Sequence, residues 1–298
     1  MDKLIEREPA ARHALVAAPA LAIQFFVIPL VVVGVTVLGY LGFRSLVADT
    51  RTAQDYVSEV RFGGSSRRWP AAYELSRLLS DPKVRADRTL APALLKAFED
   101  SANDDDPRVR RYLALAIGRL DPPLPPQAVA VLAKALEDPD GEARISAIWA
   151  LGASGDEAVI PKLQPLAQST DAGIRKMVVY ALGALPGESQ TDTLRLALQD
   201  ATADVRWNAA VALARHGKVE GVPVLGQMLD RESVARIVKR DVRADEDQDP
   251  IADVMISGLR AVAALKTPSL KPAVEALSRQ DQSMKVRQAA LEALKVMG

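Results

Sequence analysis

Cysteine and histidine, which often serve as catalytic groups or metal ligands, are absent or rare in this chain. The sequence has no cysteine and two histidines, His13 and His216, which lie far apart along the chain. The acidic run Asp104–Asp106 lacks the alternating ligands and the closing glutamate of a calcium loop. The segment Gly63–Ser66 lacks the Gly-Lys-Ser/Thr ending of a phosphate-binding loop. We therefore expect no catalytic residue, no metal site and no cofactor.

The side chains best suited to recognition are three aromatic residues on successive segments, together with basic residues at equivalent places. The aromatic residues are Trp149, Tyr180 and Trp207, and the basic residues are Arg111 and Lys176. Exposed aromatic rings bordered by basic groups are typical anchors of a protein–protein interface. We therefore predict that these five residues bind a partner protein.

These residues lie within a segment that is repeated along the chain. Each copy begins near a basic residue, and the clearest copies end in Ala-Leu-Gly. We align the copies on position zero, which is occupied by Arg110, Arg144, Arg175, Arg206 and Arg287. The first three intervals are similar, and the much longer last one holds a degenerate copy with Met255 at position zero. Repeats spaced by roughly 30–35 residues are typical of stacked helical units that present a surface.

Each unit is predicted to be a helix, a turn and a second helix. A short apolar helix precedes every copy. Asp106, Asp140 and Asp171 lie four residues before position zero, where the cap of the second helix is expected. The glycines that follow the Ala-Leu or Ala-Ile pairs suit a helix C-terminus; they are Gly118, Gly152 and Gly183.

The helical period assigns a face to each position of the second helix. Positions −1, +3, +6, +7 and +10 fall on one side and are apolar, as a buried stripe requires. Positions +1 and +5, which hold the five recognition residues, point nearly opposite. These side chains are either solvated and free to bind a partner, or packed sideways on the neighbouring second helix. Both interpretations are open from the sequence.

The arginines at position zero also allow two interpretations. Arg110, Arg144, Arg175 and Arg206 can hydrogen-bond the capping aspartate or backbone carbonyls of an adjacent unit. Such bonds would make the repeat positions, Arg287 included, structural. The alternative is an anion-binding site.

The capping aspartate, the Val-Arg pair, the Ala-Leu-Gly ending and the period together resemble the HEAT-like repeats named for phycobilisome lyases. The resemblance covers residues 69–298, about six or seven units, and departs from the pattern at Met255 and in a long insertion. It implies an α-solenoid whose second helices line an inner face. The family has diverse roles in complex assembly and protein binding, so the lyase activity is not carried over.

Composition agrees with a helical stack. Of 298 residues, 49% are hydrophobic but only 4% are aromatic, which favours close-packed helix pairs over a β-sandwich. The chain has 38 basic and 38 acidic residues. This neutral balance argues against a nucleic-acid partner, because such proteins usually carry a basic excess.

An apolar run near the N-terminus predicts a single transmembrane helix over residues 22–43. No Lys, Arg, Asp or Glu lies between Arg12 and Arg44, and about 20 apolar residues are what a helix needs to cross a bilayer. A cleaved signal peptide and a buried core helix are the alternatives. Basic residues are slightly more frequent after the run than before it. We therefore expect a single-pass protein of a bacterial inner membrane, with its repeat domain in the cytoplasm.

The predicted organisation has four parts: a tail at 1–21, the membrane helix at 22–43, a helical connector with a Gly/Ser hinge at 44–66, and the repeat domain at 67–298. Trp69, Tyr73 and Leu75 are expected to cover the open end of the first unit. The charged insertion at 231–250 is expected to be a solvated loop with a helical start.

The predicted fold is all-α, a transmembrane helix followed by an α-solenoid of six to seven HEAT-like helix pairs. The predicted function is that of a non-enzymatic scaffold that docks a protein, either a membrane complex or its soluble component. The alternative is an accessory factor or chaperone that presents a substrate or cofactor, as in the lyase-associated relatives.

Overall fold

The computed structural model describes residues 27–47, 51–238 and 249–298. Its contacts divide the chain into two units, Met1–Arg51 and Thr52–Gly298. The described residues form helices and no β-strand. The all-α prediction is therefore confirmed for this part of the chain.

In the first unit the apolar run forms helix α2, Ile28–Val47. The predicted tail at 1–21 and the start of the predicted membrane segment at 22–26 lie outside the described residues. Because α2 begins at Ile28 and Arg44 follows Phe43, its charge-free part covers only 28–43, and crossing a bilayer requires a longer apolar run, of about 20 residues. None of the described helices is long and apolar enough to span a membrane. The predicted membrane location is therefore wrong, and the predicted anchor has no support in the structure.

The second unit contains seven helix pairs within its described residues. The first helices are α3 (Ala53–Phe62), α6 (Leu90–Asp100), α8 (Pro126–Lys134), α10 (Ile160–Leu163), α12 (Thr191–Ala197), α14 (Val222–Leu229) and α17 (Lys271–Gln280). The second helices are α4 (Ser65–Leu78), α7 (Pro107–Gly118), α9 (Gly141–Ala153), α11 (Ala172–Ala184), α13 (Ala203–Arg215), α16 (Pro250–Leu265) and α18 (Met284–Met297). Short helices extend or join them: α5 (Pro82–Arg85), α15 (Arg231–Ile237), η2 (Ala135–Glu137), η3 (Glu157–Val159), η4 (Gln164–Gln168) and η5 (Pro268–Leu270).

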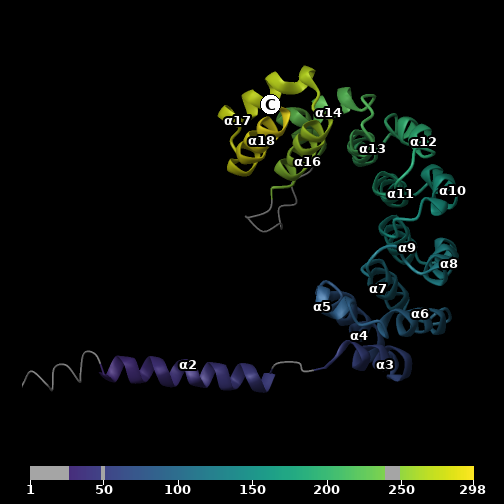
Figure 1. Cartoon of the computed structure of the whole chain (residues 1–298), viewed down its shortest axis with the longest axis vertical. Helices are drawn as coiled ribbons and strands as arrows, with labels where there is room; N and C mark the ends of the chain where they lie inside the picture. Colours follow the sequence, from purple (N-terminus) through teal and green to yellow (C-terminus); the bar gives the residue numbers. More distant parts are fainter. Residues whose placement is uncertain (1–26, 48–50, 239–248) are drawn as a thin grey trace, which may run out of the picture. The chain divides into compact units, whose positions relative to one another are not determined.

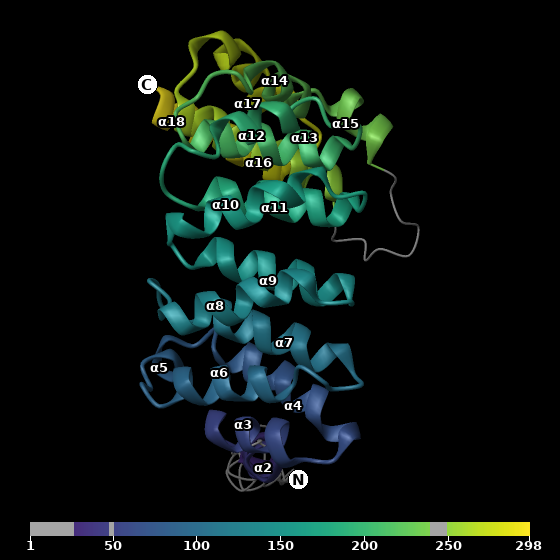
Figure 2. The same ribbon diagram turned by 90° about the vertical axis from the view of Figure 1, so that its right-hand side faces the viewer.

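Each second helix of this unit packs against the second helix of the next pair, in chain order from α4 to α18. The pairs stack one after another (Figure 2), with α7, α9, α11 and α13 on the inner side of the stack and α6, α8, α10 and α12 on the outer side (Figure 1). The predicted buried stripe forms these contacts, since Val109, Leu113 and Ile117 are inaccessible to solvent. The prediction of a solenoid of helix pairs is confirmed.

The recurring glycine allows neighbouring second helices to approach closely. A Cβ atom added to Gly152 of α9 would lie 2.7 Å from the Cα atom of Ala181 in α11. Gly118 and Gly183 face Ala150 and Ala212 in the same way. None of the three has a positive φ angle; after Gly152 and Gly183 that conformation occurs a few residues later, at Gly155 and Gly187. The Ala-Leu-Gly glycine is therefore needed for packing, not for a left-handed helix cap.

The helical stack begins earlier than the sequence pattern suggested. Helix α3, which falls in the predicted connector, has a capping box formed by Thr52 and Asp55, and it buries Tyr56, Val57 and Val60. It packs against α4 and α6. Gly63 ends α3 and Gly64 precedes α4, so they form the turn of the first helix pair.

Because α3 precedes α4, the residues expected to cover the open end of the stack have other positions. Leu75 is fully buried in the core. Trp69 is half-buried and stacks with Tyr112 of α7 at 6.4 Å between ring centroids.

The insertion at 231–250 begins with helix α15, while its residues 239–248 lie outside the described part of the chain. Its first residue, Arg231, forms an ion pair with Asp281, which precedes α18 in the stack.

Candidate functional site

The arginines at position zero tie each second helix to the loop that precedes it. In each of the five copies with an arginine at position zero, the Nη1 group donates a hydrogen bond to the carbonyl oxygen six residues earlier. The donors are Arg110, Arg144, Arg175 and Arg206, with distances of 2.6–2.9 Å, and Arg287 makes the same bond. We call these five residues the arginine column.

Two of these arginines also bind a carboxylate of the following unit. The Nε and Nη2 groups of Arg110 donate to the two oxygens of Asp138 at 2.6 and 3.1 Å, and Arg175 binds Asp200 at 2.8 and 3.0 Å. Such two-point pairs are the strongest form of this contact. Burial favours a higher pKa at Asp138, but the hydrogen bonds from Arg110 and from the backbone of Asp140 outweigh it and lower that pKa. The hydrogen bond from Arg175 lowers the pKa of Asp200.

Asp138 and Asp200 lie six residues before position zero of their own units, two residues before the predicted cap. Each also accepts a hydrogen bond from the backbone N–H of the capping residue. The capping positions hold Asp106, Asp140 and Asp171, whose carboxylates accept from the first backbone N–H groups of α7, α9 and α11. Sequence reasoning missed the role of the −6 position, although Asp104, Asp138, Asp200 and Asp281 repeat there.

Two units depart from this pattern. In one the −6 position has no carboxylate, and in the other an arginine from elsewhere in the chain takes the place of the position-zero arginine. Ser169 occupies the −6 position of the unit that follows Arg144, so the sequence supplies no carboxylate at that position. Where Met255 replaces the arginine, Arg231 from α15 binds Asp281 at 2.7 and 2.9 Å. The insertion therefore supplies the cation that the degenerate copy lacks.

The three aromatic residues predicted to bind a partner differ in exposure. Tyr180 is 39% exposed and Trp207 only 5%. Trp149 is half-buried, and its ring lies against Gly118 of the preceding second helix. Trp149 and Trp207 therefore pack on the stack, whereas Tyr180 presents much of its ring to solvent.

Arginine side chains accompany two of these rings. The Arg119 guanidinium lies 5.7 Å from the ring centroid of Trp149, and Arg215 lies 5.9 Å from that of Tyr180. Burial lowers the pKa of Arg119.

The two predicted basic residues form ion pairs across successive second helices. Arg111 lies 3.2 Å from Glu142, and Lys176 lies 3.6 Å from Asp204. In both pairs the cation stands at position +1 and the acid at position −2 of the following unit. All four side chains remain substantially exposed, between 38% and 58%.

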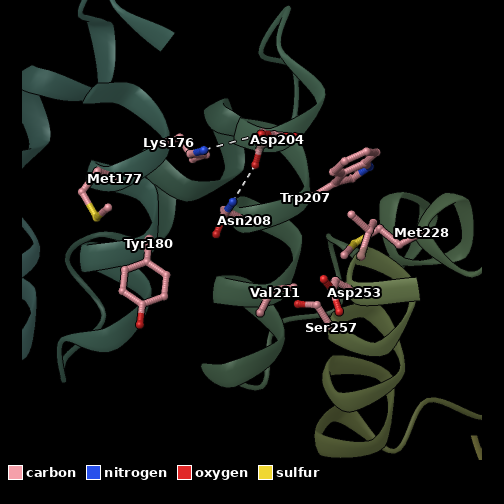
Figure 3. A pocket seen from close by; sticks show the side chains of 11 residues that line it. Lys176, Met177, Tyr180, Asp204, Trp207, Asn208, Val211, Met228, Asp253 and Ser257 are labelled. Carbon is pink, nitrogen blue, oxygen red and sulfur yellow. Dashed lines mark hydrogen bonds and ion pairs between the residues drawn. The ribbon is translucent and has the colours of Figure 1, made fainter. Parts of the chain in front are cut away.

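A pocket of about 350 Å³ opens where α11, α13 and α16 meet (Figure 3). It brings together Lys176, Tyr180 and Trp207 from the predicted set, whereas Trp149 and Arg111 lie outside it. We call it the inner-face pocket. It is lined by Lys176, Met177, Tyr180, Asp204, Trp207, Asn208, Val211, Met228, Asp253, Val254 and Ser257.

The lining is mainly apolar, with charged groups at Lys176, Asp204 and Asp253. Asn208 donates to the carbonyl of Asp204 on its own helix (Figure 3). Among the residues that the structure describes, no three potential metal ligands cluster. The chemistry that this arrangement offers is apolar contact and charge pairing.

A second aromatic group lies on α4 and α7. Tyr112 meets the edge of Tyr73 at 5.2 Å and stacks with Trp69, and the Arg108 guanidinium lies 4.2 Å from the Trp69 ring centroid. Arg68 precedes Trp69 and forms an ion pair with Asp104 through Nη1 at 2.6 Å, while its Nε donates to the Val60 carbonyl oxygen. Like Asp138 for Arg110, Asp104 lies at the −6 position of the following unit. This places Trp69 and Tyr73 at positions +1 and +5, an equivalence that the sequence hides because α4 lacks the Ala-Leu-Gly ending.

Comparisons with solved structures find repeat proteins of low sequence identity. The CpcE–CpcF complex of phycocyanin lyase from Nostoc is 20% identical, with a TM-score of 0.57, and the match covers 83% of this chain and 88% of that one. A designed armadillo repeat protein in complex with the peptide (KR)4 is 17% identical, with a TM-score of 0.44 and coverage of 84% and 100%. Human deoxyhypusine hydroxylase is 20% identical, with a TM-score of 0.35 and coverage of 82% and 95%.

No curated protein matches the sequence. A family model of HEAT repeats matches residues 91–183 and 165–244. Together these matches span 91–244, which is more than half of the chain, and they cover the pairs from α6/α7 to α12/α13. The chain therefore belongs to the HEAT-repeat family.

Proposed function

We propose that this protein is a non-enzymatic scaffold that docks a partner protein on the inner face of its helical stack. The inner-face pocket carries the proposal, because it joins an exposed aromatic ring, apolar side chains and charged groups at a junction of three second helices. Interfaces are usually anchored by such aromatic residues in partly enclosed sites.

Within this proposal the five predicted residues have different parts. Tyr180 and Lys176 contact the partner directly, because both side chains are exposed beside the pocket. Trp207 supports the pocket from within the core. Trp149 and Arg111 extend the contact surface toward α7. The expectation of a membrane complex depended on the membrane anchor, so the proposal does not include it.

A photo-crosslinking amino acid placed along the stack in the native cells tests this proposal. Position 180 probes the inner face and position 196 the outer face, where Leu196 of α12 is 67% exposed. We expect a discrete crosslinked partner from position 180 and none from position 196. Tyr180→Ala should then reduce co-purification of that partner, whereas Leu196→Ala, the matched control, should not. Equal capture from both positions, or capture from position 196 alone, would contradict the proposal.

The second candidate is an accessory role in which the stack presents a substrate or cofactor to another protein. Its support is the volume of the inner-face pocket, about 350 Å³, which is in the range of small-molecule sites. A ligand that binds only the folded state raises the melting temperature by mass action. A screen with tetrapyrroles and quinones that produces no such rise would count against this candidate.

A further inference from the structure

Charges on the inner face pair between successive second helices in a regular way. The residue at +1 of one unit faces the residue at −2 of the next, as in the Arg111–Glu142 pair at 3.2 Å and the Lys176–Asp204 pair at 3.6 Å. Between α9 and α11 both positions are uncharged, since Ile145 faces Gly173. At these two junctions the acids Glu142 and Asp204 are therefore paired with cations of the preceding helix.

The pairing fails between α13 and α16. Asp253 occupies the −2 position of α16, but the +1 position of α13 holds Trp207 in place of a cation. The Trp207 side chain belongs to the core and is 5% exposed. Asp253 is exposed at the pocket, and no basic group of the described residues lies within 4.0 Å of its carboxylate.

The other tryptophan at +1 shows a different arrangement. Trp69 of α4 faces Arg108 at the −2 position of α7, and the guanidinium lies 4.2 Å from the ring centroid. At that junction the tryptophan contacts a cation of this chain, the guanidinium of Arg108. At the Trp207–Asp253 junction the carboxylate is present, and none of the residues that the structure describes supplies a cation to it.

Resting on the proposed function, we propose that Asp253 binds a lysine or arginine side chain of the partner protein. Asp253 lies beside Ser257 and the apolar residue Val211 in the inner-face pocket (Figure 3), which Val254 also lines. A lysine or arginine has an apolar stem and a charged end, so one side chain can contact both kinds of lining. The partner segment therefore carries a basic residue next to an apolar one.

Other occupants fit the pocket less well. An acidic segment would meet Asp204 and Asp253, while Lys176, the one cation among the described residues of the lining, is already paired with Asp204. A wholly apolar segment would cover Asp253 and remove its water without supplying a partner, and a buried unpaired charge is costly.

The test begins with selection of binding peptides on the full-length protein. A phage-displayed library of short random peptides is selected on the wild-type chain and depleted on Tyr180→Ala. The remaining peptides depend on the inner-face pocket. Because Tyr180 is uncharged, this selection does not itself favour basic or acidic peptides. We expect them to contain a lysine or arginine beside an apolar residue.

Fluorescence anisotropy then measures these peptides against variants of the full chain. Asp253→Asn should weaken binding about tenfold, as expected for loss of a charge-assisted contact. Changing the basic residue of the peptide to glutamine should weaken it equally, and the two changes together should add little. Asp192→Asn is the matched control, because Asp192 also lies in the first turn of its helix and is exposed, but on the outer helix α12. It should leave the affinity unchanged.

Each outcome separates the two claims. Peptides that depend on Tyr180 but lack a basic residue, or that bind Asp253→Asn as tightly as the wild type, overturn the inference and leave the proposed docking face standing. If no peptide depends on Tyr180, both the inference and the docking face are contradicted.

Discussion

The second helices carry two sets of residues. The sets differ in how far their charged groups are bonded to other groups of the same chain. On the loop side, the arginine column binds carbonyls and carboxylates of the same chain, and the side chains of Arg110 and Asp138 are only 10% and 7% exposed. On the inner side, Tyr180 and Asp253 at the pocket are exposed, and Asp253 faces no cation among the described residues.

This difference indicates which residues hold the stack together and which are available to a partner. The arginine column repeats from unit to unit because every unit must fix the same loop. Positions −2, +1 and +5 vary from unit to unit, with tryptophan, tyrosine, lysine, aspartate and valine among them. We infer that the repeated positions maintain the fold and that the varied positions determine binding.

The largest effect is expected on the loop side. Asp138→Asn leaves the buried Arg110 guanidinium without its carboxylate, and loss of one partner of a buried pair costs about 3 kcal/mol. Urea unfolding should show this loss, whereas the peptides selected for the inner-face pocket should bind with unchanged affinity. An unfolding free energy within about 0.5 kcal/mol of wild type, as for an ordinary surface substitution, would show that the column does not hold the stack.

A smaller loss is expected where neighbouring second helices touch. Gly152→Ala inserts a methyl group 2.7 Å from the Ala181 Cα atom, and overpacking of this kind costs about 2 kcal/mol. Gly226→Ala is the control, because the nearest atom would be 3.5 Å away on the flexible side chain of Leu270. Thermal unfolding of both variants compares them. Equal melting temperatures would remove the packing explanation for the repeated glycine.

The position that lacks its carboxylate allows a gain of stability. Ser169→Asp should supply Arg144 with the acceptor that Arg110 and Arg175 already have, and it should retain the bond to the Asp171 backbone N–H. A charge-assisted hydrogen bond contributes about 1 kcal/mol or slightly more. Ser169→Asn, which has nearly the same shape without the charge, should give less. A loss of stability in Ser169→Asp would show that the Ser169 site differs from the others.

The smallest effect concerns the pH dependence of stability. Because the hydrogen bond from Arg175 lowers the pKa of Asp200 in the folded state, the ionised carboxylate stabilises the fold. This contribution is complete above the pKa of the unfolded chain, about 3.9, and is lost as the pH falls through the folded-state pKa. Asp200→Asn should therefore lose less stability than the wild type as the pH falls from about 5 to about 2. Parallel pH profiles would contradict this assignment.

The sequence alone predicted the parts of the fold that repeat. The period of the apolar residues placed Val109, Leu113 and Ile117 in the core, because a helix that buries one stripe must repeat apolar residues at that spacing. The pairing of α3 with α4 was missed, because α4 carries no Ala-Leu-Gly ending and α3 follows directly on a polar segment and was assigned to the connector. The membrane helix was predicted from apolar residues alone, and the point at which α2 begins could not be read from them.

The site was less predictable because it depends on contacts between units. The helical period placed Tyr180 and Trp207 on one face, but it could not show that Trp207 turns into the core while Tyr180 stays exposed. The role proposed for Asp253 was missed, since it depends on Lys176 and Asp204 pairing across the preceding junction while no described residue pairs with Asp253.

The most direct test of this division of roles measures stability and binding for two variants side by side. Tyr180→Ala should lower the melting temperature by about 3 °C or less and abolish capture of the partner that is crosslinked from position 180. Asp138→Asn should lower the melting temperature by about 8 °C and retain that capture at temperatures where it is folded. If Tyr180→Ala keeps the partner, or if folded Asp138→Asn loses it, binding does not reside on the inner face and the account is contradicted.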